Sequence, residues 1–404
     1  MSQPHRLPGL ILVCAGALMG PLDTAVNVAF PSITGAFGLP LRDIQWIVLA
    51  FAVTQSVLTL ASGRLGDLYG HRRIFALGMA GCALAHLAAG FAPSYAWLVG
   101  LRVVQGAAVG LAMACAPALA TLLYPPEQKR RIVAIYVTSF SFGLALGPLL
   151  GGLLIDWLGW PGVFWFRAPI ALLVLLGLPL LADVRAAPHA DPADARSQPA
   201  PSETGLTRRE KIAFFFVQFD SLFINFAGFS ILLLVPYALT AWPQFSVTQA
   251  GLLIALYPGG SLLGGLLTGR LGARLTSLTL IRIGLGCASL GLLLVALAVT
   301  AHSALLLGLP LAIAGIGLGI FQVGYTDATT SLLPARHRGI AGAMVNVTRL
   351  LGILVGVSGI SAMHAALQDH QITIAITGAM LLTYTTLAIF RKRAAPRPMA
   401  GPGV

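Results

Sequence analysis

Charged residues are scarce in this sequence. Asp, Glu, Lys and Arg together make up 9% of its 404 residues, while hydrophobic residues make up 57%. Soluble globular domains carry about 25% charged residues. The composition therefore excludes a soluble globular protein and indicates a chain that crosses a membrane several times.

Cysteine is also rare, and the signatures of common catalytic sites are missing. The four cysteines lie far apart inside apolar stretches, a spacing that indicates neither a disulfide framework nor a metal site. The sequence contains no HExxH motif, no Walker phosphate loop and no GxSxG motif, so it offers no residues for ATP hydrolysis or proteolysis. We expect no enzymatic activity, no cofactor and no bound metal.

Long apolar stretches make up most of the chain. A helix needs about 20 apolar residues to cross a hydrocarbon core of ~30 Å. The first stretch is too long for the apolar core of a cleavable signal peptide, so we interpret it as a membrane helix. The sequence predicts an all-α membrane protein with twelve transmembrane helices, at approximately residues 9–35, 45–63, 74–92, 96–123, 132–155, 162–182, 211–238, 247–268, 280–300, 303–331, 340–365 and 372–390.

The basic residues are distributed unevenly along this pattern. The formal net charge is +12, and 21 of the 25 Lys and Arg fall at the termini or in the connections after helices 2, 4, 6, 8 and 10; the exceptions are Arg42, Arg102, Arg167 and Arg349. By the positive-inside rule, both termini and these connections face the cytoplasm. The positive charge therefore fits a protein of the plasma (inner) membrane that contacts anionic lipid headgroups in the bilayer, and no nucleic acid partner is expected.

The sequence contains an internal repeat, which indicates a duplicated unit. Residues 63–66 and 269–272 both read Gly-Arg-Leu-Gly, 206 residues apart. Residues 183–210 are rich in Pro, Ala, Ser and charge and lack an apolar run, which is typical of a linker. We predict two parallel six-helix bundles, at 1–182 and 211–391, joined by a cytoplasmic linker at 183–210 and followed by a cytoplasmic tail at 392–404.

Several motifs carry a resemblance to a known family. Residues 63–73, Gly-Arg-Leu-Gly-Asp-Leu-Tyr-Gly-His-Arg-Arg, resemble the loop motif of the major facilitator superfamily. Residues 22–31 and 44–46 resemble signatures of the fourteen-helix branch of its drug:proton antiporters, and residues 102–106 resemble the family's Arg and Gln-Gly motif in helix 4. The chain departs from that branch because its linker is too short and polar for two further helices, and because Ala273 replaces the acidic residue in the second loop copy.

The resemblance implies roles for two of these motifs. The loop would be a conformational latch that holds the halves together in the outward-open state, with Asp67 facing the start of helix 11 near Gly339 and Ile340. The predicted latch consists of Gly63, Asp67, Gly70, Arg72, Arg73 and Glu127, the last of these meeting one of the two arginines. A glycine- and proline-rich pattern in helix 5, associated with antiporters, would seal the halves against leak; it consists of Gly143, Gly147, Pro148, Gly151 and Gly152.

Ionisable side chains inside membrane helices cost about 2.5 to 3.5 kcal/mol on insertion scales and are therefore functional candidates. Asp23 in helix 1 and Arg102 in helix 4 are predicted to lie at similar depths. The proton affinity of a carboxylate changes when a neighbouring arginine moves, so we predict that this pair couples transport to protons. The alternative is a fixed ion pair that orients helices 1 and 4.

Other polar residues are candidates for the cavity or its gate. Asp220 in helix 7 is expected either to line the cavity or to pair with Arg349 in helix 11. Asp327, close to the cytoplasmic end of helix 10, is expected to belong to an inner gate; the alternative is that its side chain extends toward water. Arg167 in helix 6 is expected to have a local partner; if it reaches the cavity instead, it favours an anionic substrate. His86 fits a hydrogen-bonded structural histidine. The predicted substrate-cavity residues are Asn27, Gln105, Asp220, Asn225 and Tyr325.

Together these patterns predict a secondary transporter that works by alternating access. The predicted reaction is the export of a small organic or drug-like compound in exchange for protons, carried out by a monomer. One alternative is proton-coupled uptake of a small metabolite or organic anion. A receptor or regulator without turnover is a third alternative, against which the loop motif, the helix 1 carboxylate and the helix 5 pattern all argue.

Overall fold

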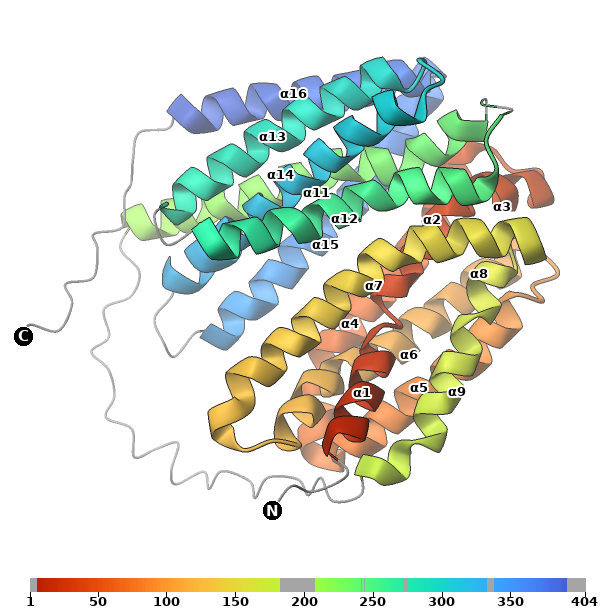
Figure 1. The fold of residues 1–404 in the computed structure, drawn as a ribbon, viewed down its shortest axis with the longest axis vertical. Helices are drawn as coiled ribbons and strands as arrows, with labels where there is room; N and C mark the ends of the chain where they lie inside the picture. The colour runs from red at the N-terminus through yellow and green to blue at the C-terminus, as the bar shows by residue number, and fades with distance from the viewer. Residues whose placement is uncertain are drawn as a thin grey trace, which may run out of the picture.

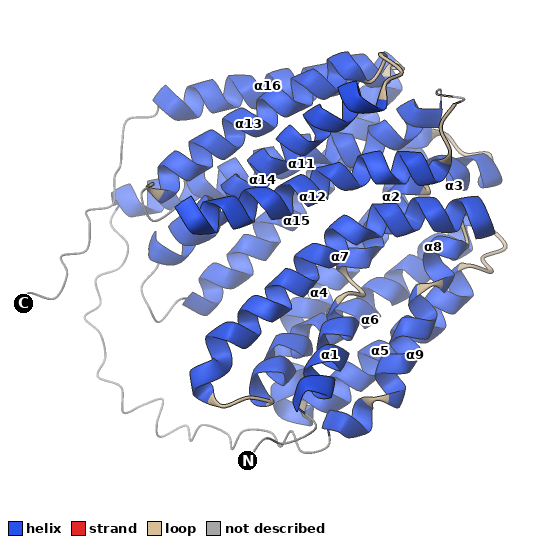
Figure 2. Cartoon of the chain, viewed as in Figure 1, coloured by secondary structure: helices blue, strands red, loops and turns tan. Residues whose placement is uncertain are grey.

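The computed structural model describes residues 6–181, 208–240, 242, 244–271, 275–332 and 338–390. The described residues are almost entirely helical and include no β-strand (Figure 2). They contain ten helices that are long and apolar enough to cross a membrane, together with a shorter apolar helix over Gly162–Leu176. This confirms the prediction of an all-α membrane protein.

The helical segments form two groups that lie side by side (Figure 1). The first group, residues 6–181, contains α1 (Arg6–Ala17), η1 (Pro21–Thr24), α2 (Ala25–Val28), α3 (Phe30–Phe37), η2 (Leu41–Ile44), α4 (Gln45–Tyr69), α5 (His71–Ala89), α6 (Tyr95–Leu122), η3 (Pro126–Gln128), α7 (Lys129–Leu158), α8 (Gly162–Trp165), α9 (Arg167–Leu176) and η4 (Leu178–Leu181). The second group, residues 208–390, contains α11 (Arg208–Thr240), α12 (Val247–Leu271), α13 (Ser277–Ala298), α14 (Ala304–Leu332), α15 (Arg338–Leu367) and α16 (His370–Phe390).

Each predicted apolar stretch corresponds to helix in the structure, but two of the stretches are broken. The first is interrupted between Ala17 and Pro21. Pro21 has no backbone N–H to continue the ladder, so the chain changes to a 3₁₀ turn there. The sixth stretch is interrupted at Phe166, and α9 begins directly afterwards with Arg167. Asp23 and Arg167 therefore both lie at helix breaks.

The two groups pack together at one end of the molecule. One buried apolar cluster includes Phe30 and Ile33 of α3 together with Leu234 of α11 and Trp242. We call this the far end; the opposite end, where α1 begins and α16 finishes, is the terminal end (Figure 1). A second buried cluster contains only residues of the first group. The apolar contact between the groups is therefore concentrated at the far end.

Candidate functional site

A cavity of about 800 Å³ lies between the two groups. It extends toward the terminal end, because Val137 and Thr138 of the first turns of α7 and Thr330 of the last turn of α14 line it. Its polar lining comes from both groups and includes Asp23, Thr24, Asn27, Gln55, Asn225, Gln322, Asp327 and Arg349. Its apolar lining includes the rings of Phe51, Phe140, Phe229 and Tyr257.

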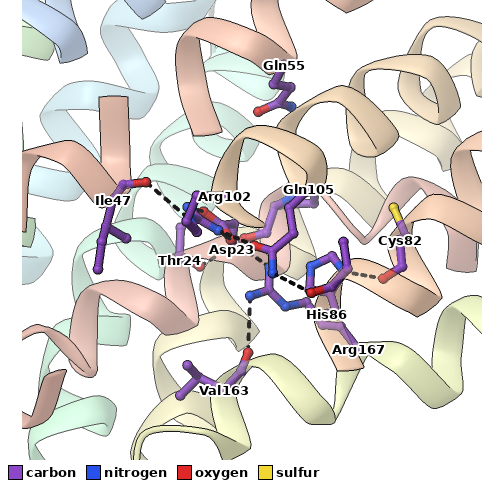
Figure 3. A network of polar contacts seen from close by, with 12 residues as sticks. Asp23, Thr24, Ile47, Gln55, Cys82, His86, Arg102, Gln105, Val163 and Arg167 are labelled. Atoms are coloured by element: carbon purple, nitrogen blue, oxygen red, sulfur yellow. Dashed lines mark hydrogen bonds and ion pairs between the residues drawn. The ribbon is translucent and has the colours of Figure 1, made fainter. Parts of the chain in front are cut away.

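Asp23 binds two arginines rather than one (Figure 3). Arg102 Nη1 donates to Asp23 Oδ1 at 2.7 Å, and Arg102 Nη2 donates to Oδ2 at 2.6 Å. Arg167 Nη1 donates to the same Oδ1 at 2.6 Å. The pairing of Asp23 with Arg102 that the sequence indicated is therefore present, and a second guanidinium shares the carboxylate.

Arg102 is held from several sides. Its Nε donates to the backbone carbonyl of Ile47 at 3.0 Å, and its Nη1 also donates to Gln105 Oε1 at 3.0 Å. The guanidinium lies 4.1 Å from the centre of the Phe51 ring. Gln105 is held in turn, because its amide donates to the carbonyl of Ala85 at 3.2 Å. These contacts fix the arginine in one orientation.

Arg167 does not have only the local partner expected from the sequence. Its Nη2 does donate to the carbonyl of Val163, four residues earlier, at 3.1 Å. Its ion pair, however, is with Asp23, which lies 144 residues away in the chain. The break in the sixth helical stretch places Arg167 at the start of α9, from where it reaches the break beside Pro21. The expected local partner is therefore present, and the ion pair with Asp23 is a further contact that the sequence did not indicate.

The three residues form a buried cluster with one excess positive charge. The side chains of Arg102 and Arg167 are 1% and 0% exposed, and that of Asp23 is 15% exposed. Two guanidiniums against one carboxylate leave a formal charge of +1. Asp23 lines the cavity and the arginines lie behind it, so the cavity reaches the cluster through the carboxylate.

His86 of α5 lies next to this cluster (Figure 3). Its side chain is fully buried, and its Nδ1 lies 2.7 Å from the carbonyl of Cys82. The contact agrees with the expected hydrogen-bonded histidine. Within the described part of the chain, neither His86 Nε2 nor Arg167 Nε has a hydrogen-bond partner.

Only two of the five predicted cavity residues line the cavity, namely Asn27 and Asn225. Gln105 is fully buried behind Arg102. Tyr325 is 2% exposed and donates to Gln218 Oε1 at 2.7 Å. Asp220 is 6% exposed and accepts a hydrogen bond from Tyr384. Each of these three side chains forms hydrogen bonds within its own group and points away from the cavity. Their assignment to the cavity surface is therefore corrected.

Among the described residues, the predicted latch residues form no ion pair with one another. Asp67 forms an ion pair with His71 at 3.4 Å, and its side chain is 72% exposed. Gly70 connects α4 to α5 with φ = 91°, which favours glycine. Among the described ion pairs, none joins Arg72 or Arg73 to Glu127. The surroundings of Gly63, Gly339 and Ile340 lie outside the described residues, so the latch stays a prediction.

The glycines of the predicted helix 5 pattern lie in α7 where its backbone approaches other segments. A Cβ atom at Gly143 would lie 2.8 Å from Leu18 Cδ2, and one at Gly147 would lie 3.1 Å from the backbone nitrogen of Ala25. One at Gly151 would lie 2.7 Å from the carbonyl oxygen of Ala25, and one at Gly152 would lie 2.9 Å from Thr248 Cα of α12. Pro148 lies inside α7. The close contacts between α7 and the two segments beside it therefore require small residues.

Comparison with known proteins shows that the sequence matches the model of a known family. The sequence model described as Major Facilitator Superfamily matches residues 12–357. The Puromycin resistance protein pur8 of Streptomyces alboniger is 38% identical over 181 residues, which cover 44% of this chain and 36% of that protein. The Multidrug resistance protein Stp of Mycobacterium tuberculosis is 27% identical over 416 aligned residues, which cover 89% of this chain and 76% of that protein. The match to the first of these relatives thus spans only about a third of its length.

Solved structures share the fold. A bacterial homologue of the human lysosomal transporter Spinster, in an inward-facing and occupied conformation, superposes with a TM-score of 0.76 at 19% identity and covers 96% of this chain and 97% of its own. At this identity the likeness concerns the fold alone. It agrees with the two helical groups seen here.

Proposed function

The chain belongs to the Major Facilitator Superfamily, whose members are integral membrane transporters, and from that premise we propose that it exports small organic compounds in exchange for protons. The relatives named for puromycin and multidrug resistance support export as the direction. The mixed polar and aromatic lining of the cavity supports an organic molecule of drug size, since such sites typically occupy about 300–1,000 Å³. We expect no enzymatic activity.

The observation that carries the proton coupling is the position of Asp23. Its carboxylate is the part of the buried cluster that faces the cavity, and it is held by Arg102 and Arg167. Protonation would neutralise the carboxylate, weaken both ion pairs and change the formal charge of the cluster from +1 to +2. Because charge is costly inside a membrane, such a change would alter which arrangement of the helices is favoured.

Alternating access would move one group of helices against the other. We propose that residues 1–182 and 211–391 act as the two rocking units, with 183–210 as the linker and 392–404 as the tail. The distribution of basic residues supports a cytoplasmic location for the terminal end in the plasma (inner) membrane. In this orientation the cavity opens toward the cytoplasm, and the contacts at the far end close it to the outside. We propose that the unit of transport is the monomer.

Proton flux in inverted membrane vesicles tests this function. A panel of organic compounds is added to energised vesicles, and collapse of the proton gradient is measured. We expect at least one compound to dissipate the gradient, and Asp23→Asn to abolish that response. Asp43→Asn is the matched control, because Asp43 lies outside the cavity and pairs only with its neighbour Arg42 among the described ion pairs. Compound-dependent flux that persists in Asp23→Asn would contradict the coupling role.

The excess positive charge favours a second candidate, proton-coupled uptake of an organic anion. An empty site carries +1, and a site that holds both a proton on Asp23 and a monovalent anion also carries +1. Equal charge in the two states would allow both to cross the membrane at similar electrostatic cost. The direction of net movement separates the candidates: an exporter accumulates the compound inside inverted vesicles, whereas an importer removes it from them.

A further inference from the structure

We propose that Arg167 makes the part of the cavity beside Asp23 reject positively charged compounds, so that the substrates are uncharged or anionic organic molecules. This inference rests on the proposed transport function and adds a charge selectivity to it. It assigns to Arg167 a role in specificity, exerted through Asp23 and through the net charge of the cluster.

The first step is that arginine donors already contact both oxygens of Asp23. Asp23 Oδ1 accepts hydrogen bonds from both Arg102 and Arg167, and Oδ2 accepts one from Arg102. An organic cation that approached this carboxylate would compete with two guanidiniums in direct contact with it. With one arginine the pair would be neutral, so the second arginine gives the cluster its positive charge.

The second step is that neither arginine is free to turn away. Arg102 is held by the carbonyl of Ile47 and by Gln105, and Arg167 is held by the carbonyl of Val163. Both side chains are buried. Their charge therefore acts on the cavity from fixed positions and through a medium of low dielectric, where salt screens it little.

The third step concerns the remaining lining of the cavity. Four uncharged carboxamide residues line it, two from each group: Asn27, Gln55, Asn225 and Gln322. The other carboxylate in the lining, Asp327, lies in the last turns of α14 and accepts a hydrogen bond from Ser277. Arg349 adds a further cationic residue. The lining thus offers hydrogen-bond donors and acceptors for uncharged groups, and the buried cluster gives a positive potential beside Asp23.

The test uses three xanthene dyes of similar shape and different charge: a cationic rhodamine, anionic fluorescein and an uncharged dialkyl ether of fluorescein. Their transport is measured in proteoliposomes that contain the purified full-length protein. For the natural protein we expect the cation to be transported at least about tenfold less efficiently than the uncharged dye, as a fixed charge within roughly 10 Å of the substrate implies.

Two substitutions at Arg167 separate charge from packing. Arg167→Gln removes the charge and keeps an amide donor, so we expect it to reduce the discrimination against the cation by about tenfold. Arg167→Lys keeps the charge and should preserve the discrimination. Arg42→Gln is the matched control, because Arg42 is exposed and lies outside the cavity. The ratio of cationic to uncharged transport is the readout, so differences in protein yield do not affect it.

The possible results lead to different conclusions. Equal transport of the cation and the uncharged dye by the natural protein, or an unchanged ratio in Arg167→Gln, would overturn the selectivity role while leaving the transport function intact. No transport of any dye, together with no response to the compound panel in vesicles, would overturn the proposed function, and the selectivity would fall with it.

Discussion

Asp156 and Thr248 connect the two helical groups at the far end of the molecule. The carboxylate of Asp156, near the end of α7, accepts hydrogen bonds from the backbone N–H and the hydroxyl of Thr248 at 2.8 and 2.6 Å. It also accepts the N–H of Val247 at 3.2 Å. Val247 and Thr248 are the first residues of α12, where free N–H groups and the helix dipole favour an anion. One side chain of the first group therefore caps a helix of the second.

This contact predicts that Asp156→Asn weakens closure of the far end. The substitution removes the charge and one acceptor, which should cost about 1 kcal/mol in the closed arrangement because the site is partly exposed to solvent. The population ratio of closed to open states should then fall about fivefold. Spin labels at the exposed residues Trp157 and Gln244 would report the distance across the far end.

Asp369→Asn provides the control for this measurement. Asp369 also accepts a backbone N–H at the start of a helix, from Ile372 at 2.9 Å, but both residues belong to the second group. We expect its substitution to leave the distance across the far end unchanged. If both variants widened the distance equally, the effect would come from loss of helix capping in general, and Asp156 would have no special part in closure.

Substitution of Gly251 provides a second prediction for the contact between α12 and α7. A Cβ atom at this position would lie 3.0 Å from Gly152 Cα and also against the carbonyl of Pro148, so the backbones of α12 and α7 would have to separate. Overpacking of this kind typically costs about 1–3 kcal/mol. We expect Gly251→Ala to keep the far end from closing fully and to lower turnover about tenfold or more.

Gly259→Ala is the matched control in the same helix. A Cβ atom at Gly259 would meet no atom within 4 Å, so the substitution should be tolerated. Turnover and the distance across the far end are measured for both variants. Equal loss of turnover in the two would indicate that α12 tolerates no change at glycine, and would contradict a specific contact with α7.

The Asp23 cluster predicts a non-additive effect on stability. Asp23→Asn leaves two buried guanidiniums without their carboxylate and should lower the free energy of unfolding by about 3–5 kcal/mol. In Asp23→Asn combined with Arg167→Gln, the formal charge of the cluster returns from +2 to +1. We therefore expect the double variant to be more stable than Asp23→Asn alone.

Thermal unfolding of the purified variants in detergent measures this coupling. Arg167→Gln alone supplies the fourth corner of the double-mutant cycle. Additive losses from the two single changes would show that Arg167 and Asp23 do not stabilise one another, despite the 2.6 Å separation of Arg167 Nη1 from Asp23 Oδ1.

The outline of the fold and two of the three residues of the buried cluster could be predicted from the sequence. Apolar runs reveal membrane helices because the hydrocarbon core demands about 20 such residues in each. Asp23 and Arg102 stood out because charges are rare in such runs. The second arginine on Asp23 was missed because its position depends on breaks in two helices. Pro21 and Pro169, which lies in the first turn of α9, were both visible in the sequence, but neither shows that the two breaks lie side by side.

The cavity lining was harder to predict for a different reason. A residue's depth in the membrane follows from its place in the helix, but the direction of its side chain depends on how the helix is rotated and packed. Tyr325 and Gln105 lie on helices of the two groups, yet each points into its own group because a hydrogen-bond partner lies there. Sequence alone cannot distinguish such a side chain from one that faces the cavity.

The last prediction concerns Asp67, the acidic residue of the proposed latch. In the present conformation its side chain is largely exposed and pairs with His71 at 3.4 Å. An exposed pair of this kind contributes about 0–1 kcal/mol, so the contact with His71 assigns no important role to Asp67 in the conformation described here. If Asp67 acts, it acts in the other conformation, where the terminal end closes and the start of α15 becomes its predicted partner.

Asp67→Asn should therefore slow turnover without changing the equilibrium affinity for substrate, and His71→Gln should leave both almost unchanged. Turnover in proteoliposomes and equilibrium binding in detergent separate these effects. Loss of affinity in Asp67→Asn, or equal slowing by both substitutions, would contradict the assignment of Asp67 to a latch.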